Sequence, residues 1–197
     1  TFDSGKTWRR SSVGISHQWK NTCYWVQFDP KQKDKLWSAW GSYHDLPKLK
    51  MTGLEGWRQR AVGGVATSLD GGRTWQVTAT GLPAQAPTTC VLMDPASEVG
   101  NRTLFAAVYG TGVYKSVDDG NSWELKIDGV TQHAPNAWEL VYGADGVLYL
   151  VVTFDVLFDD GEGHRALQDG ALYRSTDGAE SWQRVPLPAQ VRFPNSL

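Results

Sequence analysis

The four histidines of this chain are its best candidates for proton exchange near neutral pH. They are His17, His44, His133 and His164. His44 is followed directly by Asp45, and Pro47 stiffens the segment two residues later. An imidazole beside a carboxylate can donate or accept a proton during glycosidic cleavage. We therefore predict His44 and Asp45 as catalytic residues, with the alternative that adjacent side chains point apart and both are solvated.

Carboxylates gather around the last histidine: Asp155, Asp159, Asp160, Glu162 and Asp169. Two carboxylates from separate loops can form the acid and base of a glycosidase. Asp45 with Asp159 or Asp160 is the pairing we predict first, which makes Asp159 a third catalytic candidate. The oxygens of Asp159, Asp160 and Glu162 also suit a calcium ion. The segment lacks the twelve-residue spacing of a helix-loop-helix calcium site, so a solvated acidic loop is the simpler interpretation, and no cofactor is expected.

Aromatic and basic side chains accompany these groups. Tryptophan rings offer apolar faces for pyranose rings, and cationic side chains pair with carboxylates. The predicted substrate-binding residues are His17, Trp19, Lys20, Trp57, Arg58, His133, Asn136, His164 and Arg165. For Trp57 the alternative is a ring that pins its own loop.

The elements that position these residues come from a repeat. Four eight-residue windows read Ser/Thr-x-Asp-x-Gly-x-Ser/Thr-Trp, with Ala179 in place of the last glycine. They are TFDSGKTW (1–8), SLDGGRTW (68–75), SVDDGNSW (116–123) and STDGAESW (175–182). Successive windows lie 67, 48 and 59 residues apart. Repetition at such periods indicates stacked, similar units.

The windows resemble the Asp-box, or BNR, repeat of sialidases, xyloglucan-cleaving glucanases, sortilin and photosystem assembly factors. The resemblance covers essentially the whole chain. It implies that each box is the turn between the third and fourth strands of a β-propeller blade. An aspartate can accept backbone N–H bonds in such a turn, and glycine supplies the positive φ. Asp3, Asp70, Asp118 and Asp177 are therefore predicted to be structural.

The boxes divide residues 1–197 into blade units of about 9–75, 76–123 and 124–182, incomplete at both ends. Near-continuous apolar runs such as TLFAAVYG (103–110) suit strands covered on both faces, and no helical periodicity occurs. We predict an all-β propeller of four-stranded antiparallel blades. The extra length falls in 42–62 and 155–170, between second and third strands. The resemblance places these insertions and the blade-to-blade loops, with all four histidines, on the face opposite the boxes.

About three to three and a half blades are present, where a complete propeller is expected to have six or seven. An isolated half-propeller exposes two apolar sheet edges. We therefore expect the remaining blades to come from the same longer chain or from a partner chain. Cys23 and Cys90 fall in consecutive inner strands at matching parity, which permits a disulfide; buried free thiols are the alternative.

Composition and resemblance together define the expected function. A net charge of −2 disfavours nucleic-acid binding, and no apolar run is long enough to span a membrane. The resemblance implies a secreted or periplasmic carbohydrate-active propeller enzyme. We expect a glycoside hydrolase or polysaccharide lyase acting on a plant or microbial glycan, with oligo- or polysaccharide as its partner. The alternative is a non-catalytic propeller that binds a glycan or a protein.

Overall fold

The computed structural model contains three four-stranded antiparallel sheets and one two-stranded hairpin. It describes residues 1, 3–11, 13–15, 22–41, 62–78, 80–83, 87–132, 135–159, 165–194 and 196. Within those residues there is no helix, and so none that could span a membrane. The all-β prediction is confirmed.

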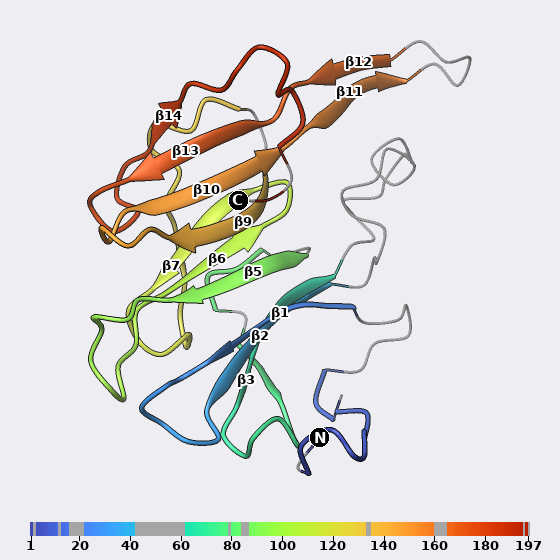
Figure 1. Cartoon of the computed structure of the whole chain (residues 1–197), viewed down its shortest axis with the longest axis vertical. Coiled ribbons are helices and arrows are strands. Elements are labelled where there is room, and N and C mark those ends of the chain that lie inside the picture. The colour runs from blue at the N-terminus through green and yellow to red at the C-terminus, as the bar shows by residue number, and fades with distance from the viewer. Residues whose placement is uncertain are drawn as a thin grey trace.

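Each sheet has the strand order predicted for a propeller blade, and we call the sheets blades A, B and C (Figure 1). Blade A consists of β1 (Thr22–Phe28), β2 (Leu36–Gly41), β3 (Gly63–Ser68) and β4 (Gln76–Thr78). Blade B consists of β5 (Thr88–Met93), β6 (Leu104–Val108), β7 (Gly112–Ser116) and β8 (Glu124–Leu125). Blade C consists of β9 (Asn136–Tyr142), β10 (Leu148–Thr153), β13 (Ala171–Ser175) and β14 (Gln183–Val185).

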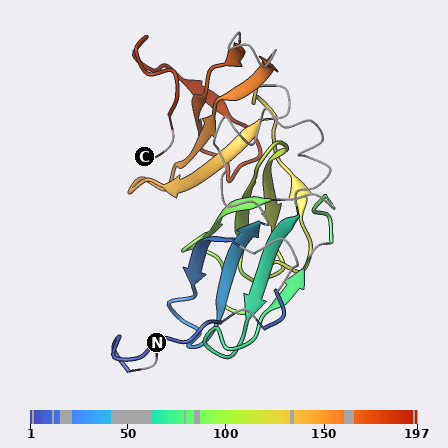
Figure 2. The ribbon, with the colours of Figure 1, turned by 90° about the vertical axis from the view of Figure 1, so that its right-hand side faces the viewer.

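The blades stack face to face, with a hydrophobic core in each gap (Figure 2). Strand β6 explains the continuous apolar runs in the sequence. Leu104 and Ala106 pack into the core shared with blade A, whereas Phe105 and Ala107 pack into the core shared with blade C. Alternate residues of one strand thus face two different apolar neighbours, so no position is left for a polar side chain.

A buried ion pair also joins blades A and B. The Arg102 guanidinium donates from Nε and Nη2 to the two carboxylate oxygens of Asp29, at 2.8 and 2.7 Å. Neither side chain is exposed to solvent. The carboxylate of Asp29 also accepts the backbone amides of Lys31 and Gln32. A bidentate pair of this kind fixes the angle between two sheets as well as their distance.

A second recurring contact connects each blade with the segment that precedes it. The backbone amides of Trp75, Trp123 and Trp182 donate to carbonyls of the residues before Gly14, Gly81 and Gly129. These glycines have φ between 82° and 96°, and a Cβ on any of them would lie within about 2 Å of a tryptophan carbonyl oxygen. Only glycine fits both constraints.

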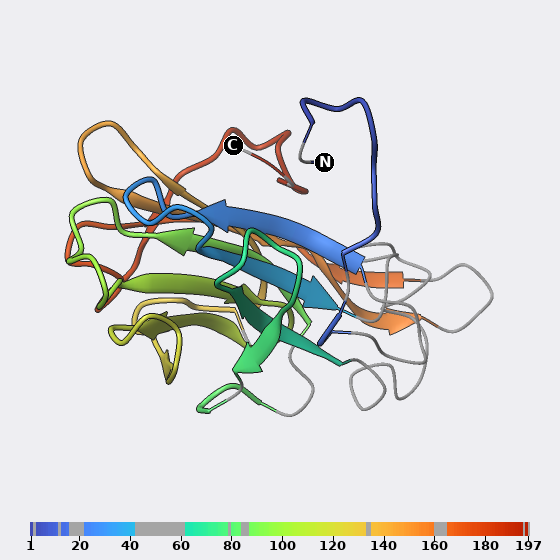
Figure 3. The same cartoon turned by 90° about the horizontal axis from the view of Figure 1, so that it is seen from below.

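Strand pairing defines two ends of the molecule. Strands β1, β5 and β9 begin opposite the ends of β2, β6 and β10, where the insertions depart. The repeated turns follow β3, β7 and β13 at the other end. Figure 3 shows hairpin β11–β12, which belongs to the second insertion, extending from the insertion end. We call this end the loop face and the opposite end the turn face.

The second insertion differs in part from the predicted acidic loop. Asp155–Asp159 and Arg165–Gln168 form the antiparallel strands β11 and β12. The run from Val156 to Phe158 in β11 is apolar at every position, which is a short strand signal that the sequence analysis missed.

Candidate functional site

Most of the predicted site residues lie outside the described part of the chain. They are His17, Trp19, Lys20, His44, Asp45, Trp57, Arg58, His133, Asp160, Glu162 and His164. Asp159 and Arg165 are described only by their backbone, and they are paired across β11 and β12 on the loop face. Both insertions begin at this face, where the inner strands β1, β5 and β9 also begin.

Asn136, the remaining predicted substrate-binding residue, is buried at the start of β9 with 1% exposure. Its Nδ2 donates to the carbonyl of Phe154 at 3.0 Å. Its Oδ1 is buried, and no described residue donates a hydrogen bond to it. The side chain therefore fastens β9 to the beginning of the second insertion.

The inner strands of all three blades carry a β-bulge at the same place. Pairing skips Tyr24 in β1, Thr89 in β5 and Trp138 in β9. A bulge re-aims the extra side chain and is over-represented beside active sites. Here the three bulged residues line one cleft of about 210 Å³ among the inner strands, near the loop face. We call it the axial cleft.

Aromatic rings dominate the axial cleft. The rings of Tyr24 and Trp138 meet edge to face, with centroids 5.8 Å apart. Tyr109, which follows β6 directly, also meets Trp138 edge to face, with centroids 6.5 Å apart. Three blades thus contribute one ring each to a single cluster, which holds the indole in a fixed orientation.

Thr89 connects the bulges of blades B and C by hydrogen bonds. Its hydroxyl lies 2.7 Å from the carbonyl oxygen of Trp138 and 3.2 Å from that of Ala137. Thr89 is 4% exposed, so these bonds are shielded from water. The backbone that carries Trp138 is therefore anchored to the neighbouring blade.

One carboxylate lines the axial cleft among the described residues. Glu139 follows Trp138 directly and lines the cleft with Trp25 and Ser196. An aromatic ring and a carboxylate side by side can stack on a sugar ring and accept hydrogen bonds from its hydroxyls. The axial cleft therefore combines an aromatic surface with one carboxylate.

The four repeated aspartates bond within their own turns on the turn face. Each carboxylate accepts the amide and the hydroxyl of the Ser or Thr four residues later, at 2.5–3.0 Å. The hydroxyl two residues earlier donates to the same carboxylate. Ala179 adopts φ 69°, so it takes the glycine conformation at the position where the other turns have glycine.

These hydrogen bonds lower the pKa values of the aspartates. The hydroxyl and amide of Thr7 lower the pKa of Asp3 to about 2. The amide and hydroxyl of Thr74 do the same for Asp70, and Ser181 does so for Asp177. At Asp118, burial raises the pKa, but the hydrogen bonds from Ser122 and Ser116 outweigh it and the net shift is downward. All four carboxylates are therefore anions that hold turns, far from the axial cleft.

Asp169, one of the acidic residues around His164, is paired with a cation. Arg192 donates to its carboxylate from Nη2 at 2.7 Å and from Nε at 3.1 Å. The guanidinium lowers the pKa of Asp169. Among the described residues no group of acidic, histidine or cysteine side chains could hold a metal ion.

The two cysteines are free and lie on opposite faces of their strands. Cys23 is exposed, whereas Cys90 is buried with its thiol 3.7 Å from the carbonyl of Leu140 in blade C. The parity argument for a disulfide fails because Cys23 precedes the bulge of its strand and Cys90 follows the bulge of the next. A bulge reverses the facing of every residue beyond it.

Solved structures with a similar fold include two GH74 proteins. A GH74 enzyme from Niastella koreensis matches at 20% identity with a TM-score of 0.53, over 81% of this chain and 20% of that one. A GH74 xyloglucanase from Xanthomonas campestris matches at 20% identity with a TM-score of 0.51, over 83% of this chain and 22% of that one. A protein of unknown function from Dyadobacter fermentans matches at 16% identity with a TM-score of 0.52, over 87% and 56% of the two chains.

The chain is a partial β-propeller. Its three stacked, four-stranded antiparallel blades and its likeness to the GH74 propellers confirm the predicted fold class. The chain spans about a fifth of the length of the two GH74 proteins. No family model matches the chain, and no curated protein matches its sequence.

Sequence reasoning missed two features of this propeller. The bulges that build the axial cleft have no local signature, because the bulged residues are Tyr, Thr and Trp in turn. The linker glycines did carry a signal, since Gly14, Gly81 and Gly129 each stand six residues after a box tryptophan.

Proposed function

We propose that this chain is part of a carbohydrate-active propeller enzyme, a glycoside hydrolase or polysaccharide lyase acting on a plant or microbial glycan. The axial cleft carries the proposal, because equivalent bulges from three blades converge there on an aromatic and carboxylate-lined surface. The fold shared with GH74 enzymes supports the same class of substrate. The setting that goes with this class is secreted or periplasmic.

In this proposal the axial cleft binds a sugar ring and the two insertions supply the reacting groups. Trp138 and Tyr24 provide the apolar surface, and Glu139 accepts sugar hydroxyls. Hydrolysis needs two carboxylates, one on each side of the scissile bond. Asp45 and Asp159 are proposed for this pair, with His44 as the proton carrier.

A non-catalytic glycan-binding propeller is the second candidate. It is favoured by one observation: Glu139 is the single carboxylate among the described residues that line the axial cleft. A binding module requires the rings and the hydrogen-bonding groups but no acid and base pair.

The two candidates are separated by measuring binding and turnover on the same glycan panel. Trp138→Ala should weaken binding roughly tenfold or more, as expected for a central aromatic anchor. Trp8→Ala is the matched control, because Trp8 is 78% exposed in the first repeated turn. Turnover is followed by new reducing ends for hydrolysis and by ultraviolet absorbance of unsaturated products for elimination.

Each outcome decides something. Turnover that is lost in Asp45→Asn and in Asp159→Asn, with binding retained, supports the enzyme. Binding without turnover in the unmodified protein supports the binding module. Binding that is equally strong in Trp138→Ala and Trp8→Ala removes the axial cleft from either function.

A further inference from the structure

The grooves between successive repeated turns have equivalent positions but different charges. One position is the residue directly after the tryptophan of a turn, and the other is the sixth residue of the next turn. Between blades B and C these residues are Glu124 and Glu180, and between blades A and B they are a glutamine and an asparagine. Between the first repeated turn (1–8) and the turn of blade A they are Arg9 and Arg73. The charge at both positions is therefore reversed beside blade A.

The groove between blades B and C balances its own charges. Lys126 pairs with Glu124 at 3.1 Å and with Glu180 at 2.8 Å, and Lys115 pairs with Glu180 at 2.7 Å. The hydrogen bonds from Lys115 and Lys126 lower the pKa of Glu180. These four residues line a cleft of about 200 Å³. Two cations thus hold one carboxylate in this groove.

The equivalent groove beside blade A contains a cleft of about 290 Å³. Arg9 and Arg73 line it, and both side chains are exposed. The Arg73 guanidinium donates to the carbonyl of Asp70 in its own turn, which fixes its direction. The other charged side chain among the described lining residues is Asp3, whose carboxylate accepts the amide and the hydroxyl of Thr7 within the first turn. Two guanidiniums therefore line this groove where two carboxylates line its counterpart.

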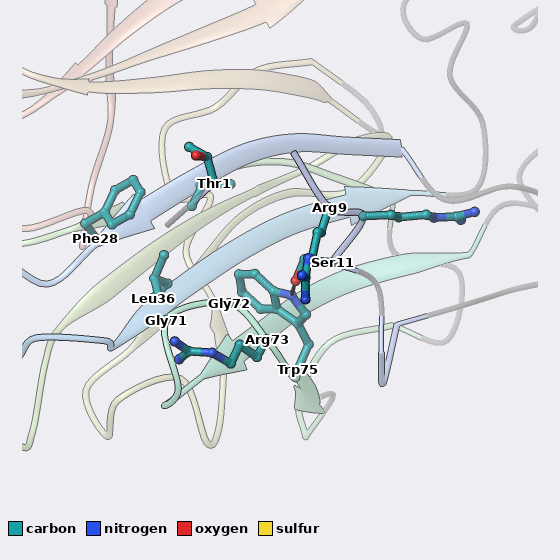
Figure 4. A pocket seen from close by; sticks show the side chains of 11 residues that line it. Thr1, Arg9, Ser11, Phe28, Leu36, Gly71, Gly72, Arg73 and Trp75 are labelled. Atoms are coloured by element: carbon teal, nitrogen blue, oxygen red, sulfur yellow. Dashed lines mark hydrogen bonds between the residues drawn. The ribbon is translucent and has the colours of Figure 1, made fainter. Parts of the chain in front are cut away.

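A larger cleft of about 650 Å³ adjoins the first one and shares Arg9 and Arg73 with it. Figure 4 shows Phe28 on one side of this cleft and Trp75 with Arg73 on the other. Phe28 is 63% exposed. Trp75 Nε1 donates to Ser11 Oγ at 3.2 Å, which orients the indole. No acidic residue occurs among the described residues that line the larger cleft, so it combines aromatic rings with cations.

The charges of the whole chain are divided in the same way. Residues 1–75 carry 12 Lys and Arg side chains against 6 Asp and Glu, whereas residues 76–197 carry 7 against 15. A positive potential around blade A attracts an anion toward these clefts. The negative potential of the remaining chain opposes a long polyanion such as a nucleic acid, which would extend across it. A small ligand with one acidic group fits this distribution.

We propose that the two adjoining clefts bind a sugar that carries a carboxylate or a sulfate group. We call them the arginine site, formed by Arg9, Arg73, Phe28 and Trp75. The two guanidiniums hold the oxyanion as the two lysines hold Glu180, because arginine pairs with planar and tetrahedral oxyanions through parallel N–H bonds. The aromatic rings contact the apolar face of the sugar. The choice of a sugar rests on the proposed function, whereas the oxyanion pocket does not.

The test is an NMR titration of the whole chain with four matched probes. Methyl glucuronide carries a ring and a carboxylate, and a glucose sulfate ester carries a ring and a sulfate. Methyl glucoside carries the ring alone, and inorganic sulfate carries the charge alone. The indole N–H of Trp75 reports on the arginine site and that of Trp138 reports on the axial cleft. Trp75→Phe and Trp138→Phe assign the two signals.

The acidic sugars should shift the Trp75 signal and bind about tenfold more tightly than methyl glucoside or inorganic sulfate, because they make both the charged and the aromatic contacts. Arg9→Gln and Arg73→Gln should each weaken this binding about tenfold, and added salt should weaken it further. Arg184→Gln is the matched control, because Arg184 is an exposed arginine of blade C. The tighter of the two acidic sugars identifies the acidic group.

A charge reversal at Arg73 tests the comparison with blade C directly. Arg73→Glu places a carboxylate at the position of Glu180, where it can pair with Arg9. This variant should no longer bind the acidic sugars, because its own carboxylate takes the place of the ligand. Its urea midpoint should not fall, so a loss of binding would not be explained by unfolding.

Three results would overturn the proposal. Equal binding of methyl glucuronide, the sulfate ester and methyl glucoside would mean that the arginines do not contact the ligand. Equal binding of inorganic sulfate and the acidic sugars would mean that the aromatic rings do not contact a sugar. A shift of the Trp138 signal alone would place the sugar in the axial cleft, which supports the proposed function and rejects the arginine site.

Discussion

The ion pair between Asp29 and Arg102 gives the sharpest stability prediction, because it joins two of the blades that form the axial cleft. Arg102→Met removes the guanidinium and keeps much of the side-chain volume. The Asp29 carboxylate then stays buried with the amides of Lys31 and Gln32, at 2.9 and 3.2 Å, as its remaining donors. Leaving one partner of a buried pair uncompensated costs about 3–5 kcal/mol. For a chain of this size the midpoint of thermal unfolding should fall by roughly 6–20 °C.

The assay is a double-mutant cycle read by urea unfolding at neutral pH. Asp29→Asn should cost a similar amount, because it leaves the Arg102 charge buried. The double variant should lose less than the sum of the two single variants, by about 1–3 kcal/mol, since it buries no unpaired charge. Lys126→Met is the control. It removes ion pairs to the partly exposed Glu124 and Glu180, and such pairs are worth about 1 kcal/mol or less.

Two results would refute this reasoning. Additive single losses would mean that Asp29 and Arg102 do not interact energetically. A loss in Arg102→Met no larger than that in Lys126→Met would mean that the pair is solvated in solution, and that apolar packing alone fixes the angle between blades A and B.

Three further predictions concern acid stability, the linkers and the thiols. The turn aspartates Asp3, Asp70 and Asp177 have folded pKa values of about 2, below their unfolded value of about 4. The stability that they contribute should therefore be present above about pH 4 and should be lost as the pH falls toward 2, and urea midpoints measured across this range would reveal the loss. Gly81→Ala should destabilise the protein far more than Gly146→Ala, because only the Cβ at residue 81 meets a backbone oxygen, at 1.9 Å; equal unfolding midpoints would contradict this. Burial raises the pKa of the Cys90 thiol to about 12, so a thiol reagent should modify Cys23 alone in the folded protein, and rapid modification of both would refute the burial of Cys90.

The blade plan could be predicted from the sequence because its signals are local. Each repeated turn contains a carboxylate that accepts hydrogen bonds within eight residues, a glycine with positive φ and a tryptophan next to the following strand. All of these interactions involve residues that are close in the sequence, so the pattern recurs along the chain. The continuous apolar runs of the second strands are equally easy to recognise in the sequence. A strand that packs against apolar neighbours on both faces has no position suited to a polar side chain. These features were sufficient for the all-β fold, whereas the separation of the turn face from the loop face was implied by the family resemblance.

Three features depended on the tertiary structure. The bulges at Tyr24, Thr89 and Trp138 arise from pairing between strands, so residue types did not reveal that these side chains converge on one cleft, nor that Cys23 and Cys90 face apart. The bidentate bond from Arg102 to Asp29 joins residues that are 73 positions apart in the chain. The exposure of Val26 and Phe28 in blade A, against the burial of Val91 and Met93 at the equivalent positions of blade B, became visible only in the structure. The sequence determined the four-stranded blade and its repetition, because the hydrogen bonds of the turns and the pattern of apolar residues along a strand involve residues that are close in the sequence. The structure decided which side chains meet, because register and stacking are set between units.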